Sequence, residues 1–88
     1  MTSAERITII QERLQKAFSP SMLQVLDDSE HHKGHEGARG GAGHYTVQIS
    51  ALIFQDKTRI EAHRMIYSVL QDLIPHEIHA LQIKIIKT

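Results

Sequence analysis

The first hydrophobic pattern of the chain is that of an amphipathic helix in its N-terminal part. Thr2 and Glu5 have the spacing of a capping box, which predicts the start of the helix, and Pro20 predicts its end. Apolar residues recur between them at helical spacing, with charged residues off that line. The stripe expected to pack on the core consists of Ile7, Ile10, Leu14 and Ala17 or Phe18.

A second helical pattern predicts the main helix over residues 58–74. Thr58 and Glu61 repeat the capping-box spacing, and Pro75 ends the pattern. A lone histidine on an apolar stripe is more often a core residue than a ligand, so His63 is interpreted as structural. The predicted inner stripe is Ile60, His63, Tyr67, Leu70 and Ile74, widened by Ile66, Val69 and Leu73.

Alternating apolar and polar residues predict strands over residues 22–28, 44–53 and 78–86. The first two are joined by residues 29–43, which hold all five glycines, and should form an antiparallel hairpin. The third follows the main helix, so it can pair in parallel through a right-handed crossover. The order α-β-β-α-β predicts an α+β fold, with two helices on one face of a three-stranded mixed sheet.

Composition mainly excludes classes of function. Ten basic and ten acidic residues cancel, which argues against a protein held on nucleic acid mainly by charge. There is no cysteine for a disulfide framework and no apolar run of membrane length. We therefore expect a single domain over residues 1–88, cytoplasmic, with no membrane partner, and a monomer or weak homodimer when alone.

The sequence contains no arrangement typical of an enzyme. It has no Ser or Cys nucleophile motif and no phosphate-binding loop. Asp27 and Asp28 are adjacent on a predicted strand, so they should point to opposite faces and share no substrate. We therefore expect a protein without enzymatic activity.

Histidine is the main candidate for chemistry, with seven residues in the chain. His32 and His35 lie in the glycine-rich loop at a spacing that could place two imidazoles on one ion, although solvated side chains are the simpler interpretation. His79 begins the last predicted strand, on the face of Leu81 and beside the helices. A rigid strand histidine and a loop histidine could complete a site when a partner binds. The alternative hypothesis for metal binding is that the histidine loop binds zinc or nickel without a partner.

A small basic group lies near the start of the main helix, formed by Lys57, Arg59 and Arg64. A solvated surface is the simplest interpretation, and contact with phosphates is the alternative. Residues 37–40 have the G-x-x-G form of a KH nucleic-acid loop. They lie between two predicted strands, whereas that loop joins two helices, so the motif carries no weight here.

Several motifs occur in a fixed order along the chain. They are Leu26-Asp27-Asp28-Ser29, His32-Lys33-Gly34-His35, Gly43-His44-Tyr45-Thr46-Val47, Phe54, His63-Arg64-Met65-Ile66-Tyr67, Leu70 and Ile78-His79-Ala80-Leu81. In this order and spacing the chain resembles the BolA family over nearly its whole length. The resemblance implies a KH-like (class II) α+β fold, with a helix-turn-helix-like region over about residues 57–73.

The resemblance also implies a function as partner of a monothiol glutaredoxin. Together the two proteins would share a bridging 2Fe–2S cluster, in cluster assembly, cluster trafficking or iron and redox regulation. On this side the ligands would be His79, of the Ile-His-Ala motif, and His32, or else His35. A glutaredoxin cysteine and glutathione would supply the thiols, so this chain alone should hold a cluster poorly.

The second function that the resemblance implies is transcription regulation by direct DNA binding, including in stress responses. Lys57, Arg59 and Arg64 would be the contacts. Family members often carry Arg before the helix histidine, where this chain has Ala62. That departure and the balanced charge make this the alternative rather than the first expectation.

Overall fold

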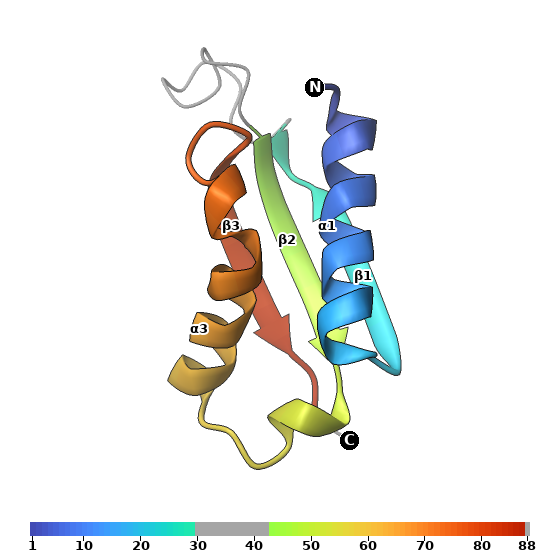
Figure 1. The fold of residues 1–88 in the computed structure, drawn as a ribbon, viewed down its shortest axis with the longest axis vertical. Coiled ribbons are helices and arrows are strands. Elements are labelled where there is room, and N and C mark those ends of the chain that lie inside the picture. Colours follow the sequence, from blue (N-terminus) through green and yellow to red (C-terminus); the bar gives the residue numbers. More distant parts are fainter. Residues whose placement is uncertain (30–42, 88) are drawn as a thin grey trace.

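The computed structural model describes residues 1–29 and 43–87 of the chain. Two helices and a three-stranded sheet account for most of them (Figure 1). Short 3-10 helices follow β2 and α3, as η2 (Leu52–Phe54) and η3 (Gln71–Leu73). The main elements in chain order are α1 (Ser3–Phe18), β1 (Met22–Asp27), β2 (Gly43–Ser50), α3 (Arg59–Leu70) and β3 (Ile78–Ile85).

The sheet has β2 at its centre, in the order β1-β2-β3. β1 runs antiparallel to β2, with Met22 opposite Ser50, and β3 runs parallel to β2, with Tyr45 opposite Leu81. Both helices cover the same face of the sheet, α1 over β1 and α3 over β3 (Figure 1). The predicted α+β fold with its hairpin and mixed sheet is therefore confirmed.

Both predicted capping boxes are present. The backbone N–H of Glu5 donates to the Thr2 hydroxyl, and that of Glu61 donates to the Thr58 hydroxyl, each over 3.1 Å. Each glutamate side chain in turn accepts from the backbone N–H of its threonine, which satisfies two amides that a helix start leaves unpaired. The local sequence thus fixes where α1 and α3 begin.

The core lies between the helices and the inner face of the sheet. Along α1 the predicted stripe is confirmed at Ile10 and Leu14, which are fully buried, whereas Ala17 is exposed. The sheet contributes its own buried row, which consists of Tyr45, Val47 and Ile49 on β2 together with Val25 and Ile83 on the two edge strands.

The predicted inner stripe of the main helix is partly wrong. Ile60 is 64% exposed and Tyr67 is 38% exposed, and the buried line instead runs through Ala62, Ile66 and Leu70. Apolar residues occupy a wider arc of α3 than the part that packs on the sheet. The periodicity alone therefore does not show which of them are buried. Ala62, which the sequence singled out only because relatives often have Arg there, is a core residue and is 1% exposed.

Two predicted ends are also wrong. The strand predicted over residues 44–53 stops at Ser50, because the chain turns into η2 so that Phe54 enters the core and packs on Phe18, with ring centroids 5.0 Å apart. The helix predicted over residues 58–74 is α-helical only to Leu70 and continues as η3. In both cases the regular element gives way to a 3-10 helix whose last residue, Phe54 or Leu73, is buried in the core.

Candidate functional site

His79 lies in a β-bulge at the start of β3. Gly43 is paired with Ile78 and His44 with Ala80, so His79 is the extra residue between them. A bulge breaks the alternation of a strand and re-aims a side chain. The prediction that His79 shares the face of Leu81 beside the helices is therefore wrong. Its side chain is exposed, while Ile78 is completely buried.

His44 is the neighbour of His79, and sequence reasoning gave it no role. The two imidazole rings have centroids 5.1 Å apart and planes tilted by 51°. His44 is only 6% exposed, and it precedes core-facing Tyr45 on β2, which places it on the face away from the helices. Only the parallel pairing of β2 with β3 brings the rings together. A hollow of about 160 Å³ adjoins His44. It is lined by Asp28, His44, Tyr45, Ala80, Leu81 and Gln82.

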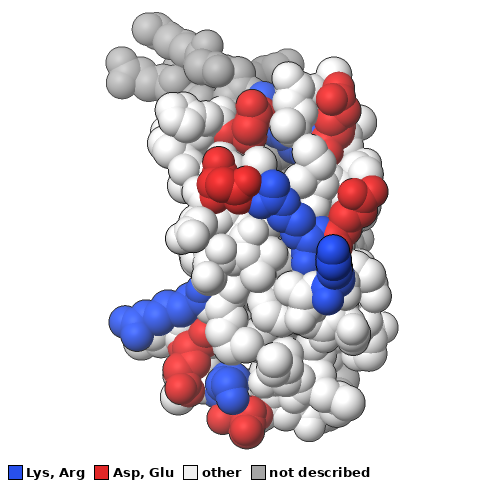
Figure 2. Space-filling view, in the orientation of Figure 1, with Lys and Arg blue, Asp and Glu red and all other residues white. Residues whose placement is uncertain are grey.

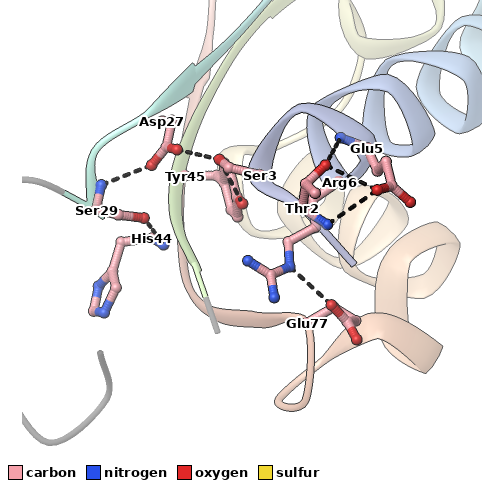
Figure 3. A network of polar contacts seen from close by, with 9 residues as sticks. All are labelled: Thr2, Ser3, Glu5, Arg6, Asp27, Ser29, His44, Tyr45 and Glu77. Atoms are coloured by element: carbon pink, nitrogen blue, oxygen red, sulfur yellow. Dashed lines mark hydrogen bonds and ion pairs between the residues drawn. The ribbon is translucent and has the colours of Figure 1, made fainter. Parts of the chain in front are cut away.

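A chain of hydrogen bonds holds the backbone of His44 (Figure 3). Its N–H donates to the Ser29 hydroxyl over 3.1 Å, and the Ser29 N–H donates to Asp27 over 2.8 Å. The other Asp27 oxygen accepts from the hydroxyl of Ser3, in the first turn of α1. These contacts tie the last residue of β1 and the start of β2 to the helix, so the position of His44 is fixed from two sides.

The carboxylate of Asp27 stays ionised within this network. Burial is the largest single influence and raises its pKa, but the hydrogen bonds from Ser29 and Ser3, with the charge of Arg6, outweigh it. The net result is a pKa below the ordinary value of an aspartate. An ionised Asp27 accepts hydrogen bonds only, which suits the donors that surround it.

An ion pair holds the turn that leads into the bulge. The Arg6 Nε lies 2.8 Å from a Glu77 carboxylate oxygen, and the backbone carbonyl of Glu77 accepts from the N–H of Gly43 over 3.0 Å (Figure 3). The hydrogen bond with Arg6 lowers the pKa of Glu77, and the same bond raises that of Arg6. The residue before Ile78 is thereby anchored to both α1 and β2.

Gly43, the first residue of β2, occupies a position where no side chain fits. A Cβ built on it would lie 2.3 Å from the ring of Tyr45, which is itself 1% exposed. The close approach of ring and backbone therefore requires glycine. The glycine thus leaves room for the Tyr45 ring against the backbone just before His44.

The remaining predicted residues lie apart from the histidine pair. His32 and His35 lie outside the described residues. His63 is half-buried on α3, and within the described part of the chain its buried Nε2 has no hydrogen-bond partner. Asp27 and Asp28 do point apart, since Asp28 accepts from Thr46 while Asp27 accepts from Ser3.

The predicted basic group is divided between two places. Lys57 and Arg59 line a cavity of about 430 Å³ together with Lys84 and Lys87 from the end of the chain. Arg64 lines a different hollow with Tyr67, farther along the same helix. Lys84 lies near the end of β3 and Lys87 just after it, far from Lys57 in the sequence. They were missed because the sequence does not reveal that the end of this strand lies beside the start of α3.

The histidine pair is too small a donor set for a closed metal site. In residues 1–29 and 43–87, no group of three or more His, Cys, Asp or Glu side chains could hold a metal ion. A closed structural zinc site needs four ligands, and two imidazoles cannot supply them. Further ligands would have to come from elsewhere. Within the same residues, no helix is long and apolar enough to cross a membrane.

The fold and site define a small α+β domain with a histidine pair at one end of its sheet. A family model described as BolA-like protein matches residues 14–88, and the chain therefore belongs to the BolA family, a family not known as enzymes. The chain is 40% identical over 79 residues to SufE-like protein 1, chloroplastic/mitochondrial, of Arabidopsis thaliana, covering 84% of this chain and 21% of the relative. It is 32% identical over 81 residues to Protein BOLA1, chloroplastic, of the same plant, covering 89% and 51%.

Solved structures agree with this membership. The BolA domain of SufE1 from Arabidopsis thaliana superposes with a TM-score of 0.81 at 35% identity, covering 99% of this chain and 94% of that one. BolA1 from the same plant gives 0.79 at 30% identity, with 93% and 90% covered. The chain spans about a fifth and about half of the length of the two curated relatives named above.

Proposed function

We propose that this protein acts as the partner of a monothiol glutaredoxin and shares a bridging 2Fe–2S cluster with it. The observation that carries the proposal is the placement of His79, exposed on a bulge and backed by the buried ring of His44. An exposed imidazole held by packing is a suitable ligand for a site that a second protein completes. The process would be cluster assembly, cluster trafficking or iron and redox regulation, in the cytoplasm.

The donor set supports sharing rather than sole possession. The chain has no cysteine, and clusters of this type are held mainly by thiolates. His79 would be one ligand of this protein, and His32 or His35 the other, while the thiols of glutaredoxin and glutathione complete the set. Imidazole ligation on one side would raise the cluster potential relative to ligation by thiolates alone.

Co-reconstitution tests the proposal. The protein is combined with a monothiol glutaredoxin, glutathione, iron and sulfide, and visible spectra are compared for the wild type, His79→Ala and His76→Ala. We expect His79→Ala to change the spectrum. His76→Ala, at an exposed histidine in the turn before β3, should leave it unchanged. Identical spectra for all three would remove His79 as a ligand. His32→Ala and His35→Ala then choose between the loop histidines.

DNA binding is the second candidate function. Relatives from Haemophilus influenzae and Escherichia coli are named DNA-binding transcriptional regulator BolA, and they are 32% and 35% identical to this chain over 73 and 72 residues. Against it, basic and acidic side chains are interspersed over α1 and α3 (Figure 2). Phosphate contacts release counterions, so true binding to duplex DNA must weaken with salt and with Arg59→Ala or Arg64→Ala. A flat salt dependence would exclude this function.

A further inference from the structure

A cavity lined by basic residues lies at the far end of β3 from His79. It opens between the start of α3 and the end of β3 and has a volume of about 430 Å³. Four of its eight lining residues are basic and none is acidic; its lining consists of Lys57, Thr58, Arg59, Ala62, Ile83, Lys84, Ile85 and Lys87. We call it the cationic cavity. It shares no residue with the histidine pair.

The cationic cavity concentrates charge that is balanced elsewhere. Of the eight Lys and Arg residues in the described part of the chain, four line this one cavity. Arg6 and Arg13 are instead paired with Glu77 and Asp72. Asp56 lies 3.2 Å from the ammonium of Lys57, and Glu61 is also within electrostatic range of Lys57, so two carboxylates offset part of this charge. A positive excess remains in a chain whose formal net charge is zero.

The walls of the cationic cavity are held in place. The Lys87 ammonium donates to the backbone carbonyl of Lys57 over 3.0 Å, which joins the end of the chain to the start of α3. The Ile86 N–H donates to the carbonyl of Ile49 over 2.8 Å and fixes the same segment to the sheet. Ala62 and Ile83 are at most 5% exposed and close the base. Because Ala62 is small, the space above it stays open.

The chemistry of this lining suits phosphate. Lys and Arg make charge-assisted hydrogen bonds to phosphate oxygens, and the volume lies in the usual range for small-molecule sites, about 300–1,000 Å³. The capping box already occupies part of the helix start, so the side-chain cations would carry the binding. We propose that the cationic cavity binds the phosphate groups of a small ligand with two or more phosphates, such as pyrophosphate or a nucleoside triphosphate.

A small ligand fits the arrangement better than duplex DNA. A duplex presents phosphates along a track, and its binding needs cations spread over a face. Here the cations surround one hollow, and Arg64, the next cation along α3, lines a different one. A duplex would need Arg64 as much as Lys84, whereas a ligand inside the cavity would not.

Titration followed by amide NMR at fixed ionic strength tests the proposal. The probes are sodium pyrophosphate, ATP and a duplex DNA, added to the wild type, Lys84→Gln, Lys87→Gln and two matched controls, Lys16→Gln and Arg64→Gln. We expect saturable shifts with pyrophosphate and ATP, confined to residues 57–62 and 83–87. Each cavity variant should weaken binding at least about fivefold, as for loss of a charge-assisted hydrogen bond, and the controls should not.

The comparison of probes gives each result a meaning. Tighter binding of ATP than of pyrophosphate supports the proposal and adds a contact to the nucleoside. Shifts that fail to saturate, or that Lys16→Gln and Arg64→Gln weaken as much as the cavity variants do, overturn it. Saturation by duplex DNA without saturation by pyrophosphate overturns it as well. None of these readouts depends on a glutaredoxin or a cluster, so the proposed function can stand or fall separately.

Discussion

The imidazole rings of His44 and His79 are in contact, with centroids 5.1 Å apart, yet only that of His79 is exposed. One ring is therefore part of the packed interior, and the other rests on it at the surface. The contribution of the buried ring to stability and the ligand role proposed for the exposed ring therefore fall on two residues of the same type. Substitutions at the two positions can test them independently.

We expect His44→Ala to lower the free energy of unfolding by about 1–3 kcal/mol, because a buried ring is lost. His79→Ala should change it by less than about 1 kcal/mol, since its side chain is exposed and its main contact is with the ring of His44. Urea denaturation followed by circular dichroism measures both. Equal losses for the two variants would contradict the packing described here.

The two isoleucines of α3 test the corrected stripe. Ile66 is completely buried and Ile60 is 64% exposed, so the same substitution has a matched control on the same helix. We expect Ile66→Ala to cost about 2–5 kcal/mol of unfolding free energy through lost burial and a cavity, and Ile60→Ala less than about 0.5 kcal/mol. The comparison is made by urea denaturation. A larger loss at Ile60 would restore the stripe predicted from the sequence.

Gly43→Ala should destabilise the fold by about 1–3 kcal/mol, as overpacking in a filled core does. The added methyl group meets the ring of Tyr45, which is buried and has little space to move. A double-mutant cycle with Tyr45→Leu identifies the cause, because removing the ring should reduce the cost of the methyl group. Additive losses would mean that the ring is not the obstacle.

Acid should weaken the fold through Asp27 and Glu77. Both have pKa values lowered in the folded state, Asp27 by its hydrogen bonds against opposing burial and Glu77 by Arg6. Their contribution is therefore complete above the unfolded pKa, about 4 for carboxyl groups, and is lost as the pH falls through the lower folded values. The urea midpoint, measured from pH 6 to pH 3, should fall over the acidic end of this range.

The variants Asp27→Asn and Glu77→Gln provide the control for this pH dependence. Each removes one titrating group, so each should start from a lower midpoint at pH 6 and lose less of it on acidification than the wild type does. Parallel curves for the wild type and both variants would assign the acid sensitivity to other carboxylates.

The sequence predicted what depends on local pattern and failed where distant segments meet. Thr2 and Thr58 could be recognised as caps because their partners lie three residues away. The bulge at His79 could not, since it depends on the register between β2 and β3, which no local signal encodes. For the same reason no role was predicted for His44, and the sequence did not predict that Lys84 and Lys57 line one cavity.

The contact between Ser3 and Asp27 has a practical consequence for work with this protein. The first turn of α1 lies at the histidine end of the molecule, and the C-terminus lies at the opposite end (Figure 1). A purification tag fused before Met1 would lie close to the hydrogen bonds that hold His44 and could disturb them. A tag after the last residue would instead lie close to Lys87 and compete for its surroundings. The choice of fusion therefore decides which of the two ends an experiment can examine undisturbed.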